Sequence, residues 1–484
     1  MRVNYNSTAT PRFQVLTSEQ VEEILSASYE ILERVGVKIH DEQAVELLCA
    51  AGAVSADGLL VKIPSSLVKS ALQSAPSRIV LRGRDKSPVV LEKDRIHFGT
   101  GSDCPVFVDP DSGKRRTTVF NDVVNAARVA DALTHIDFFM SLGLVSNAPS
   151  RSYDRHQLLA MLMGTTKPLV ITAVDAKGLS DQHEMACLVA GGRDLFRLDP
   201  LFAVYAEPSS PLVHTREAIE KVTIAAEHGI PMIYVPAPSA GGTAPVTLAG
   251  VLAEGIADTF AGLVLSQQCK PGAPFIMGGV FTALDLRTMI FSYGAPELLL
   301  LDAALSDIAK NVGLPVFSTA GCSDAKVFDQ QAALEAAMSI LMAAQSGANL
   351  IHDVGYLEYG LLGSLDMLVF SDEAIGLAKR MLRGFAVEPR TLAVDVISKV
   401  GPGGHFLVDE HTLVHHKEEL WRPQLLDRST YEAWDGSGRA TLGERVTARV
   451  KRILQTHEVP PLESDLLRDL RSIVARADSG ASDS

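Results

Sequence analysis

Residues 302–319 read DAALSDIAKNVGLPVFST and contain a complete helix-to-strand unit. Apolar residues recur at helical spacing over residues 302–312, and residues 316–319 form a short apolar run. Between them stands Gly313-Leu314-Pro315, where glycine ends the helix readily and proline prevents its continuation. A helix closed in this way before a buried strand is the connection expected in a protein of repeated βα units.

The same unit recurs along the chain. A predicted helix over residues 214–228 precedes Gly229-Ile230-Pro231, and another over residues 330–345 precedes Ser346-Gly347. Seven apolar strands are expected, at residues 138–145, 169–174, 201–206, 232–235, 275–280, 316–319 and 350–353. Because no G-x-G-x-x-G follows an early strand, the pattern favours an α/β TIM (β/α)₈ barrel over a Rossmann sheet. The eighth strand is not evident from the pattern.

The chain before the barrel is expected to form a helical and hairpin extension, residues 1–118. Thr17-Ser18-Glu19-Gln20 resembles a capping box, and a second helix is predicted over residues 41–51. Residues 78–81 and 89–91 are typical of short strands. Residues 96–100 and 106–108 are predicted to pair as a hairpin.

Residues 119–478 are predicted to form the TIM-barrel domain together with C-terminal helices. Gly401-Pro402-Gly403-Gly404 is expected to interrupt those helices. Residues 479–484 are expected to be a disordered tail.

Composition limits the classes of function. The chain has 484 residues with a net charge of −14, and this balance argues against a nucleic-acid partner, which needs clustered lysine and arginine. The acidity suits a cationic small molecule, but also simple solubility. The five cysteines are widely spaced, no run of 18 apolar residues occurs, and residues 1–11 lack a secretory h-region. We therefore expect a cytoplasmic protein with free thiols and no membrane partner.

Polar residues at the carboxyl ends of barrel strands are candidates for function, because active sites of such barrels lie there. The sequence places Tyr205 and Glu207 at one such end, and His352 with Asp353 at another. A His-Asp pair can act in acid–base chemistry or bind a carboxylate, and it can equally be a structural histidine bonded to loop carbonyls. Glu207 fits a barrel-rim ion pair as well as a catalytic role.

Metal and nucleotide sites are not predicted. His411 and His415 have a spacing that zinc can use, but Thr412 stands where the glutamate of H-E-x-x-H would be. The glycine pairs at 191–192 and 241–242 lack a P-loop context. If the protein is an enzyme, the difficult chemistry is expected to come from its substrate or a partner.

Four stretches resemble the trimethylamine methyltransferase family. They are SAGGTAPVTLAG at 239–250, GCSDAK at 321–326, LIHDVGYLE at 350–358 and GPGGHFL at 401–407. The resemblance runs from near Thr17 to about Gly438. It implies a TIM barrel with an N-terminal extension. It also implies an enzyme that moves a methyl group from a methylated amine to the cobalt of a separate corrinoid protein.

The loop at residues 321–324 consists of standard residues, which resembles the branch of the family that lacks pyrrolysine. The resemblance implies a quaternary amine as substrate, with glycine betaine or a related betaine expected first. Proline betaine, carnitine and trimethylamine are the alternatives within the family. A non-catalytic quaternary-amine binder and a metal-dependent TIM-barrel hydrolase are the alternatives outside it.

A quaternary ammonium ion leaves as a neutral amine, so the site has to hold a cation and aim one methyl group outward. Aromatic faces contribute on the order of 1–2 kcal/mol each to holding such a cation. The candidate substrate-binding rings are Phe98, Tyr205, Tyr234 and Tyr356, each of which could instead be core packing. Candidate partners of a betaine carboxylate are His352 first and His97 second.

Glu207 and Asp324 are the candidate catalytic carboxylates. No metal and no tightly bound cofactor are expected, since the corrinoid would belong to a partner protein. A homo-oligomer is also expected, because large TIM barrels with apolar helix faces often associate.

Overall fold

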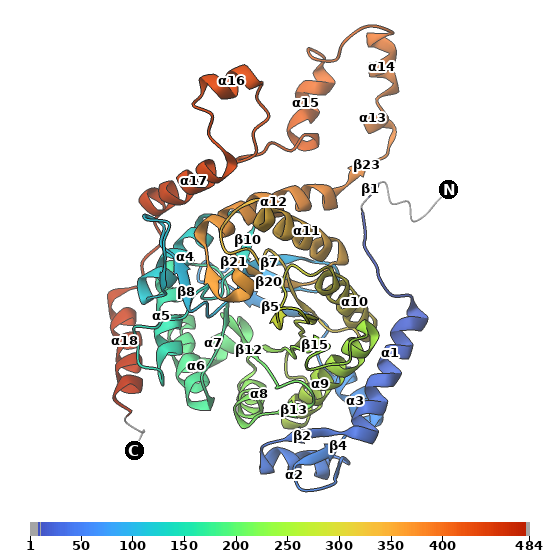
Figure 1. Cartoon of the computed structure of the whole chain (residues 1–484), viewed down its shortest axis with the longest axis vertical. Helices are drawn as coiled ribbons and strands as arrows, with labels where there is room; N and C mark the ends of the chain where they lie inside the picture. The colour runs from blue at the N-terminus through green and yellow to red at the C-terminus, as the bar shows by residue number, and fades with distance from the viewer. Residues whose placement is uncertain (1–7, 10, 481–484) are drawn as a thin grey trace.

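The computed structural model describes residues 8–9 and 11–480, and a barrel of parallel strands lies at its centre (Figure 1). In chain order the strands are β7 (His97–Thr100), β10 (Ile136–Phe138), β11 (Leu169–Ile171), β12 (Phe202–Ala206), β14 (Met232–Tyr234), β16 (Phe275–Met277), β19 (Phe317–Thr319) and β20 (Leu350–Val354). They form two parallel four-stranded sheets. Single bridges, Phe139 to Leu169 and Met277 to Val316, join the sheets. The expected α/β TIM barrel is confirmed.

The eighth strand of the barrel is β7, whose residues the sequence pattern assigns to a hairpin. It lies between β10 and β20 and pairs in parallel with both, so it is the first strand of the barrel along the chain. The predicted hairpin between residues 96–100 and 106–108 is therefore wrong. The predicted domain boundary after residue 118 also separates this strand from the barrel to which it belongs.

Helices cover the outside of the barrel. They are α4 (Phe120–Ala132), α5 (Tyr153–Gly164), α6 (Ala176–Ala190), α7 (Arg193–Leu198), α8 (Arg216–His228), α9 (Leu248–Cys269), α10 (Pro296–Val312), α11 (Gln330–Ser346) and α12 (Leu365–Arg383). Gly229, Gly313 and Gly347 end three of them at φ of 71°, 77° and 73°. These left-handed positions favour glycine, and they confirm the predicted helix-to-strand connections.

The N-terminal layer packs on α9. It contains α1 (Ser18–Glu30), a π-helical turn at Ile31–Val35, α2 (Glu42–Ala50) and α3 (Ser65–Ser74), with β2 (Val37–Ile39), β3 (Val54–Ser55) and β4 (Leu60–Lys62). Thr17 and Gln20 form the predicted capping box. β2 also pairs with β13 (Val213–His214). By length and composition α9 could cross a membrane, but it is mostly buried inside the protein, as a core helix is.

Short strands close both ends of the barrel. At the amino end, the hairpin of β5 (Ile79–Arg82) and β6 (Pro88–Leu91) packs Leu81 and Leu91 against inward side chains such as Phe138 and Phe317. At the carboxyl end, one sheet contains β8 (Val106–Val108), β9 (Arg115–Thr117), β21 (Tyr356–Leu357) and β22 (Leu362–Gly363), and a second contains β15 (Ser239–Ala240), β17 (Thr282–Asp285) and β18 (Ile290–Phe291). A 3-10 turn, Glu358–Gly360, links β21 to β22.

The C-terminal segment leaves the barrel and returns to it (Figure 1). β23 (Phe385–Ala386) pairs with β1 (Thr8–Ala9), and then α13 (Pro389–Leu392), α14 (Val394–Val400), α15 (Glu410–Glu419) and α16 (Tyr431–Gly436) follow. We call residues 385–436 the arm. After the arm, α17 (Leu442–Thr456) packs on α4 and α12, and α18 (Ser464–Ser479) packs on α5 and α6. Of the predicted disordered tail, Ser479 ends α18, and residues 481–484 lie outside the described residues.

Candidate active site at the barrel mouth

His352 and Asp353 lie at the carboxyl end of β20, and both are almost fully buried. Nε2 of His352 is 3.1 Å from Oδ1 of Asp353, and its Nδ1 is 3.0 Å from the carbonyl oxygen of Ser318. Asp353 has φ of 72°, a left-handed conformation that is strained for a residue with a side chain. Such strain persists only where the surroundings enforce it, and it is often found at functional sites.

The hydrogen bonds of His352 fix where its proton lies. Burial lowers the pKa of His352 to about 3, so the ring is neutral and carries one N–H. Because the Ser318 carbonyl can only accept, that N–H belongs on Nδ1. Nε2 is then an acceptor, and the proton between His352 and Asp353 has to come from the carboxyl group. Burial, followed by the nearby Glu207, raises the pKa of Asp353 to about 8, which agrees with a protonated acid.

This arrangement bears on the role predicted for His352, which is to bind a substrate carboxylate. A neutral ring whose two nitrogens already face Ser318 and Asp353 supplies no positive charge to a substrate carboxylate. The polar atom of this pair that is available to a ligand is on Asp353. Its Oδ2 is buried and accepts no hydrogen bond of normal geometry from the described residues, while hydrogen bonding from the Tyr293 and Tyr356 hydroxyls partly offsets the rise in the pKa of this carboxyl. Buried polar atoms normally have partners, so this carboxyl oxygen makes the mouth a candidate binding site for a ligand.

Aromatic rings surround the pair. The Phe317 ring centroid is 4.1 Å from that of His352, and the Tyr205 ring is 6.2 Å from it. Tyr293 and Tyr356 meet edge-to-face at 6.2 Å. Burial and the neighbouring Asp353 carboxyl raise the pKa of both of these tyrosines well above its usual value, so their rings stay neutral. Tyr205 and Tyr293 are partly exposed and so offer ring surface to a ligand.

The charged groups around Asp353 are mostly acids. Glu207 is exposed at the mouth, and its Oε1 accepts a hydrogen bond from the Tyr205 hydroxyl. Burial raises the pKa of Asp302 and of Asp103, and Asp353 contributes to the shift at Asp302. Lys221 is the ammonium that acts on Glu207, and its Nζ donates to the Ala173 carbonyl at 3.0 Å. The mouth therefore combines neutral rings with an excess of carboxyl groups, which favours a cation.

Tyr293 is the ring that sequence reasoning missed, and Asp324 holds its loop. The Asp324 carboxylate accepts hydrogen bonds from the Ser292 hydroxyl at 2.5 Å, from the Tyr293 amide at 2.8 Å and from the Gly294 amide at 3.0 Å. Asp324 was predicted as a possible catalytic carboxylate. In the structure both of its oxygens are occupied by this loop, so it positions Tyr293.

Three of the predicted site residues lie elsewhere. Tyr234 points away from the barrel axis, where its hydroxyl bonds to Nδ1 of His214 at 2.6 Å and its ring packs on Gly262 of α9. Phe98 belongs to the same outer core, beneath Lys379 of α12. His97 begins β7 at the amino end of the barrel, with Nε2 3.1 Å from the Val90 carbonyl. By contrast, Tyr205, Glu207, Tyr356 and His352 do meet at the mouth.

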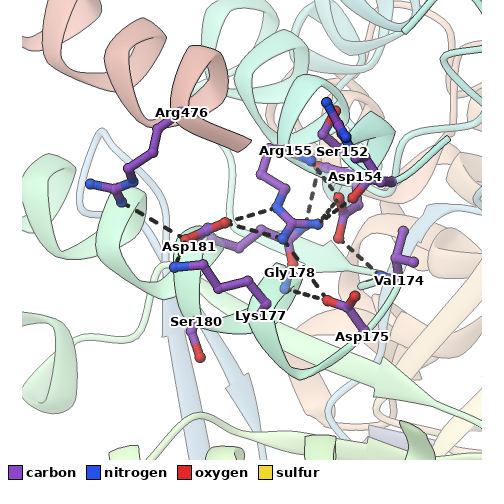
Figure 2. Close-up of polar contacts among 12 residues, drawn as sticks. Ser152, Asp154, Arg155, Val174, Asp175, Lys177, Gly178, Ser180, Asp181 and Arg476 are labelled. Atoms are coloured by element: carbon purple, nitrogen blue, oxygen red, sulfur yellow. Dashed lines mark hydrogen bonds and ion pairs between the residues drawn. The ribbon is translucent and has the colours of Figure 1, made fainter. Parts of the chain in front are cut away.

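A buried ion network supports the mouth from the side of α5 (Figure 2). Arg155 bonds to Asp154 at 2.8 Å and to Asp181 at 3.1 Å, and all three side chains are at most 3% exposed. Asp154 also accepts from the Val174 amide, just after β11, and Asp181 lies 3.8 Å from Arg476 of α18. The network thus joins the C-terminal helix to the loop after β11, and Asp154 is close enough to raise the pKa of Asp103.

Within residues 8–9 and 11–480, no group of three or more His, Cys, Asp or Glu side chains is placed to hold a metal ion. The ring centroids of His411 and His415 are 4.5 Å apart on α15, which belongs to the arm. The chemistry that the site offers from its own residues is the binding of a cation between carboxyl groups and rings.

Comparisons with known proteins agree with this combination of barrel and site. The family model for trimethylamine methyltransferases matches residues 2–481. A trimethylamine methyltransferase of Methanosarcina mazei is 33% identical, over 98% of this chain and 97% of its own. A glycine betaine methyltransferase of Desulfitobacterium hafniense is 30% identical, over 96% of this chain and 97% of its own. The chain belongs to the trimethylamine methyltransferase family, and it is a methyltransferase.

The fold also matches a solved structure. The monomethylamine methyltransferase of Methanosarcina barkeri superposes with a TM-score of 0.53 at 14% identity, over 92% of this chain and 89% of the other. At this identity the likeness concerns the fold, which is the same barrel.

Proposed function

We propose that the protein transfers a methyl group from a quaternary ammonium ion to the Co(I) of a separate corrinoid protein. The family and the methyltransferase activity support the reaction class. The observation that carries the choice of substrate is the excess of carboxyl groups, Asp353 and Glu207 above all, among the rings of Tyr205, Tyr293 and Tyr356. A permanent cation is the ligand that both kinds of group attract.

The same charges revise the expected amine. Glycine betaine is the first expectation from the sequence, with its carboxylate on His352, but that ring is neutral and occupied. We propose that the preferred substrate is a quaternary ammonium ion without an acid group. A betaine remains the second candidate because of Lys221, whose ammonium group lies near Glu207 and could receive the betaine's carboxylate.

In this mechanism, the side chains of the mouth bind and orient the substrate. The tyrosine rings hold the N-methyl groups, and Asp353, which releases its proton to solvent when the cation binds, neutralises the charge from the floor of the site. The remaining methyl group then faces out of the barrel, where the corrinoid cobalt supplies the nucleophile. No proton need reach the departing amine, because a quaternary ammonium ion leaves as a neutral tertiary amine. Asp353 and Glu207 therefore serve binding and orientation.

The experiment that tests the proposal mixes the full chain with a reduced corrinoid protein and one amine at a time, and follows methyl-cobalt(III) formation by absorbance. Tetramethylammonium, choline and glycine betaine form the panel. We expect turnover with tetramethylammonium or choline above that with glycine betaine. The His97→Ala variant, altered at the amino end, is the matched control and should behave as wild type. Turnover with glycine betaine that is lost in Lys221→Met would favour the second candidate.

We further propose that the protein acts in the cytoplasm. All five cysteines are unpaired, with Cys104, Cys187 and Cys322 buried, as expected of a protein from a reducing compartment. Fractionation of the source cells, with detection of the chain by antibody, tests this proposal.

A further inference from the structure

The arm, residues 385–436, exposes an unusual amount of apolar surface. Of the 29 exposed large hydrophobic side chains in the described part of the chain, 12 lie between residues 385 and 431. They are Phe385, Val387, Leu392, Val394, Ile397, Phe406, Leu407, Val408, Leu413, Val414, Leu420 and Tyr431. Leu407 and Val408 are 78% and 79% exposed. Exposed apolar side chains concentrated in one segment in this way are typical of an interaction site.

The helices of the arm also lack a core of their own. α13, α14, α15 and α16 contain 4, 7, 10 and 6 residues, and none of their described residues is buried. Isolated helices shorter than about 12 residues are marginal in water, and in proteins they are stabilised by packing an apolar face. Figure 1 shows α13, α14, α15 and α16 standing away from the barrel. The segment between α15 and α16 is held on α12, where Glu373 accepts hydrogen bonds from the amides of residues 424–426. The four helices themselves are left to pack on another chain.

The position of the arm indicates which chain supplies this packing. The end of α12 reaches the amino end of the barrel, where a Cβ at Gly376 would contact His135 and where Lys379 bonds to Asp137 of β10. The arm departs from there, whereas the mouth with Asp353 lies at the carboxyl ends of the strands. A methyl acceptor has to meet the mouth, so the arm is poorly placed to receive one.

The barrel itself carries an apolar surface that the arm could cover. On α11, Leu334 and Met338 are 61% and 50% exposed, one helical turn apart. On α12, which packs against α11, Leu377 and Met381 are 37% and 42% exposed and are also one turn apart. We call these four side chains the α11–α12 patch. A chain that presents both an apolar arm and an apolar patch is complementary to a second copy of itself.

We propose that the arm docks on the α11–α12 patch of a second copy of this chain, so that two chains exchange arms. The area agrees with this, because twelve side chains exposed to this degree offer on the order of 1000 Å² per chain, against about 800 Å² per partner in a standard stable interface. The inference is independent of the substrate, since neither surface contains a residue of the mouth.

The test measures the mass of the full-length protein in solution by light scattering or sedimentation. Wild type should be a dimer or a closed oligomer of dimers at micromolar concentration. The arm variant Leu407→Asp/Leu413→Asp should become monomeric, and so should the patch variant Leu334→Asp/Met338→Asp. The matched control is Leu188→Asp/Leu195→Asp, two exposed leucines on α6 and α7, which should keep the wild-type mass.

A mixture of the arm variant and the patch variant provides a second readout. One intact arm and one intact patch remain in such a pair, so a mixed dimer should form where each variant alone is monomeric. Circular dichroism checks that each variant is folded. If the arm variant fails to fold, the mass of the patch variant still tests the proposal. A monomeric wild type, or an oligomer that survives both the arm and the patch variants, would overturn the proposal.

Discussion

Nε2 of His352 lies 3.1 Å from Oδ1 of Asp353, and because Nδ1 of the same ring faces the Ser318 carbonyl, the two side chains hold one proton between them. The pair is neutral as long as that proton stays. A bound quaternary ammonium ion favours the ionised carboxylate, so binding and proton release are coupled at this position.

The first prediction concerns the pH dependence of binding. The pKa of Asp353 is raised to about 8, so below that pH the carboxyl is protonated and a cation has to displace its proton. Affinity for tetramethylammonium should rise by up to roughly tenfold per pH unit as the pH approaches about 8, and level off above it. Titration calorimetry in buffers of different ionisation enthalpy should detect close to one proton released at neutral pH. Binding without proton release would contradict the assignment.

The second prediction concerns stability. The pKa of Asp353 is 3.8 in its ordinary state and about 8 in the fold, so between these values only the unfolded chain is ionised. From about pH 6.5, where unfolded histidine is neutral, to about pH 8, this group should cost wild type about 1.4 kcal/mol of unfolding free energy per pH unit.

Asp353→Asn removes that dependence. The melting temperature of the variant minus that of wild type should therefore increase across this window, while its affinity for tetramethylammonium falls more than tenfold. His97→Ala, at the amino end of the barrel, serves as the control for binding. If this difference in melting temperature does not change with pH, the Asp353 carboxyl is ionised in the folded protein.

The third prediction separates the ring that lines the mouth from the ring that packs behind it. Tyr293→Leu should lower the affinity for tetramethylammonium about tenfold, because one cation–π contact contributes on the order of 1–2 kcal/mol. Tyr234→Phe removes the hydroxyl that bonds to His214 at 2.6 Å, so it should cost about 1–3 kcal/mol of stability. Its affinity should stay within about twofold of wild type. The reverse pattern of affinities would move the site away from Tyr293.

The fourth prediction concerns the ion network of Figure 2. Arg155→Met leaves the Asp154 carboxylate buried without its cation, and leaves Asp181 with Lys177 at 3.1 Å and Arg476 at 3.8 Å. The substitution should lower the unfolding free energy by about 3–5 kcal/mol. Arg476→Gln, whose side chain is 33% exposed, should cost less than about 1 kcal/mol. Chemical denaturation measures both. Equal effects of the two substitutions would mean that the network is not held by Arg155.

Much of the barrel can be predicted from sequence because its helix ends have a local cause. Gly229, Gly313 and Gly347 adopt left-handed φ values, and the strands after them are short apolar runs. The sequence predicts a strand at residues 96–100, but in a hairpin instead of in the barrel. This strand, β7, contains Gly99, and Gly101 follows it; glycine is unusual inside a strand. These glycines are required by contacts with residues far along the chain. A Cβ on Gly99 would lie 2.4 Å from the Phe138 ring, and one on Gly101 would lie 2.1 Å from Tyr356.

The residues of the candidate site also divide into those that the sequence predicts and those that it does not. His352 and Glu207 could be placed at the mouth because they follow apolar strands, and carboxyl ends of barrel strands converge. Tyr234 also lies at the carboxyl end of a strand, β14, yet it points outward, because side-chain direction depends on register within the barrel. Tyr293 lies in a loop between β18 and α10 that shows no period, and it reaches the mouth because Asp324 binds its amide. The protonation of Asp353 depends on burial, which no motif records.

The place of β7 in the barrel has a consequence for how the chain is made. One edge of β7 can pair with β10 soon after both leave the ribosome, but its other partner, β20, begins only at Leu350. Through most of synthesis the nascent sheet therefore keeps an open edge, which is prone to pair with other chains. We expect production to depend on chaperones and to suffer when translation pauses before residue 350, although the finished barrel has no edge at all.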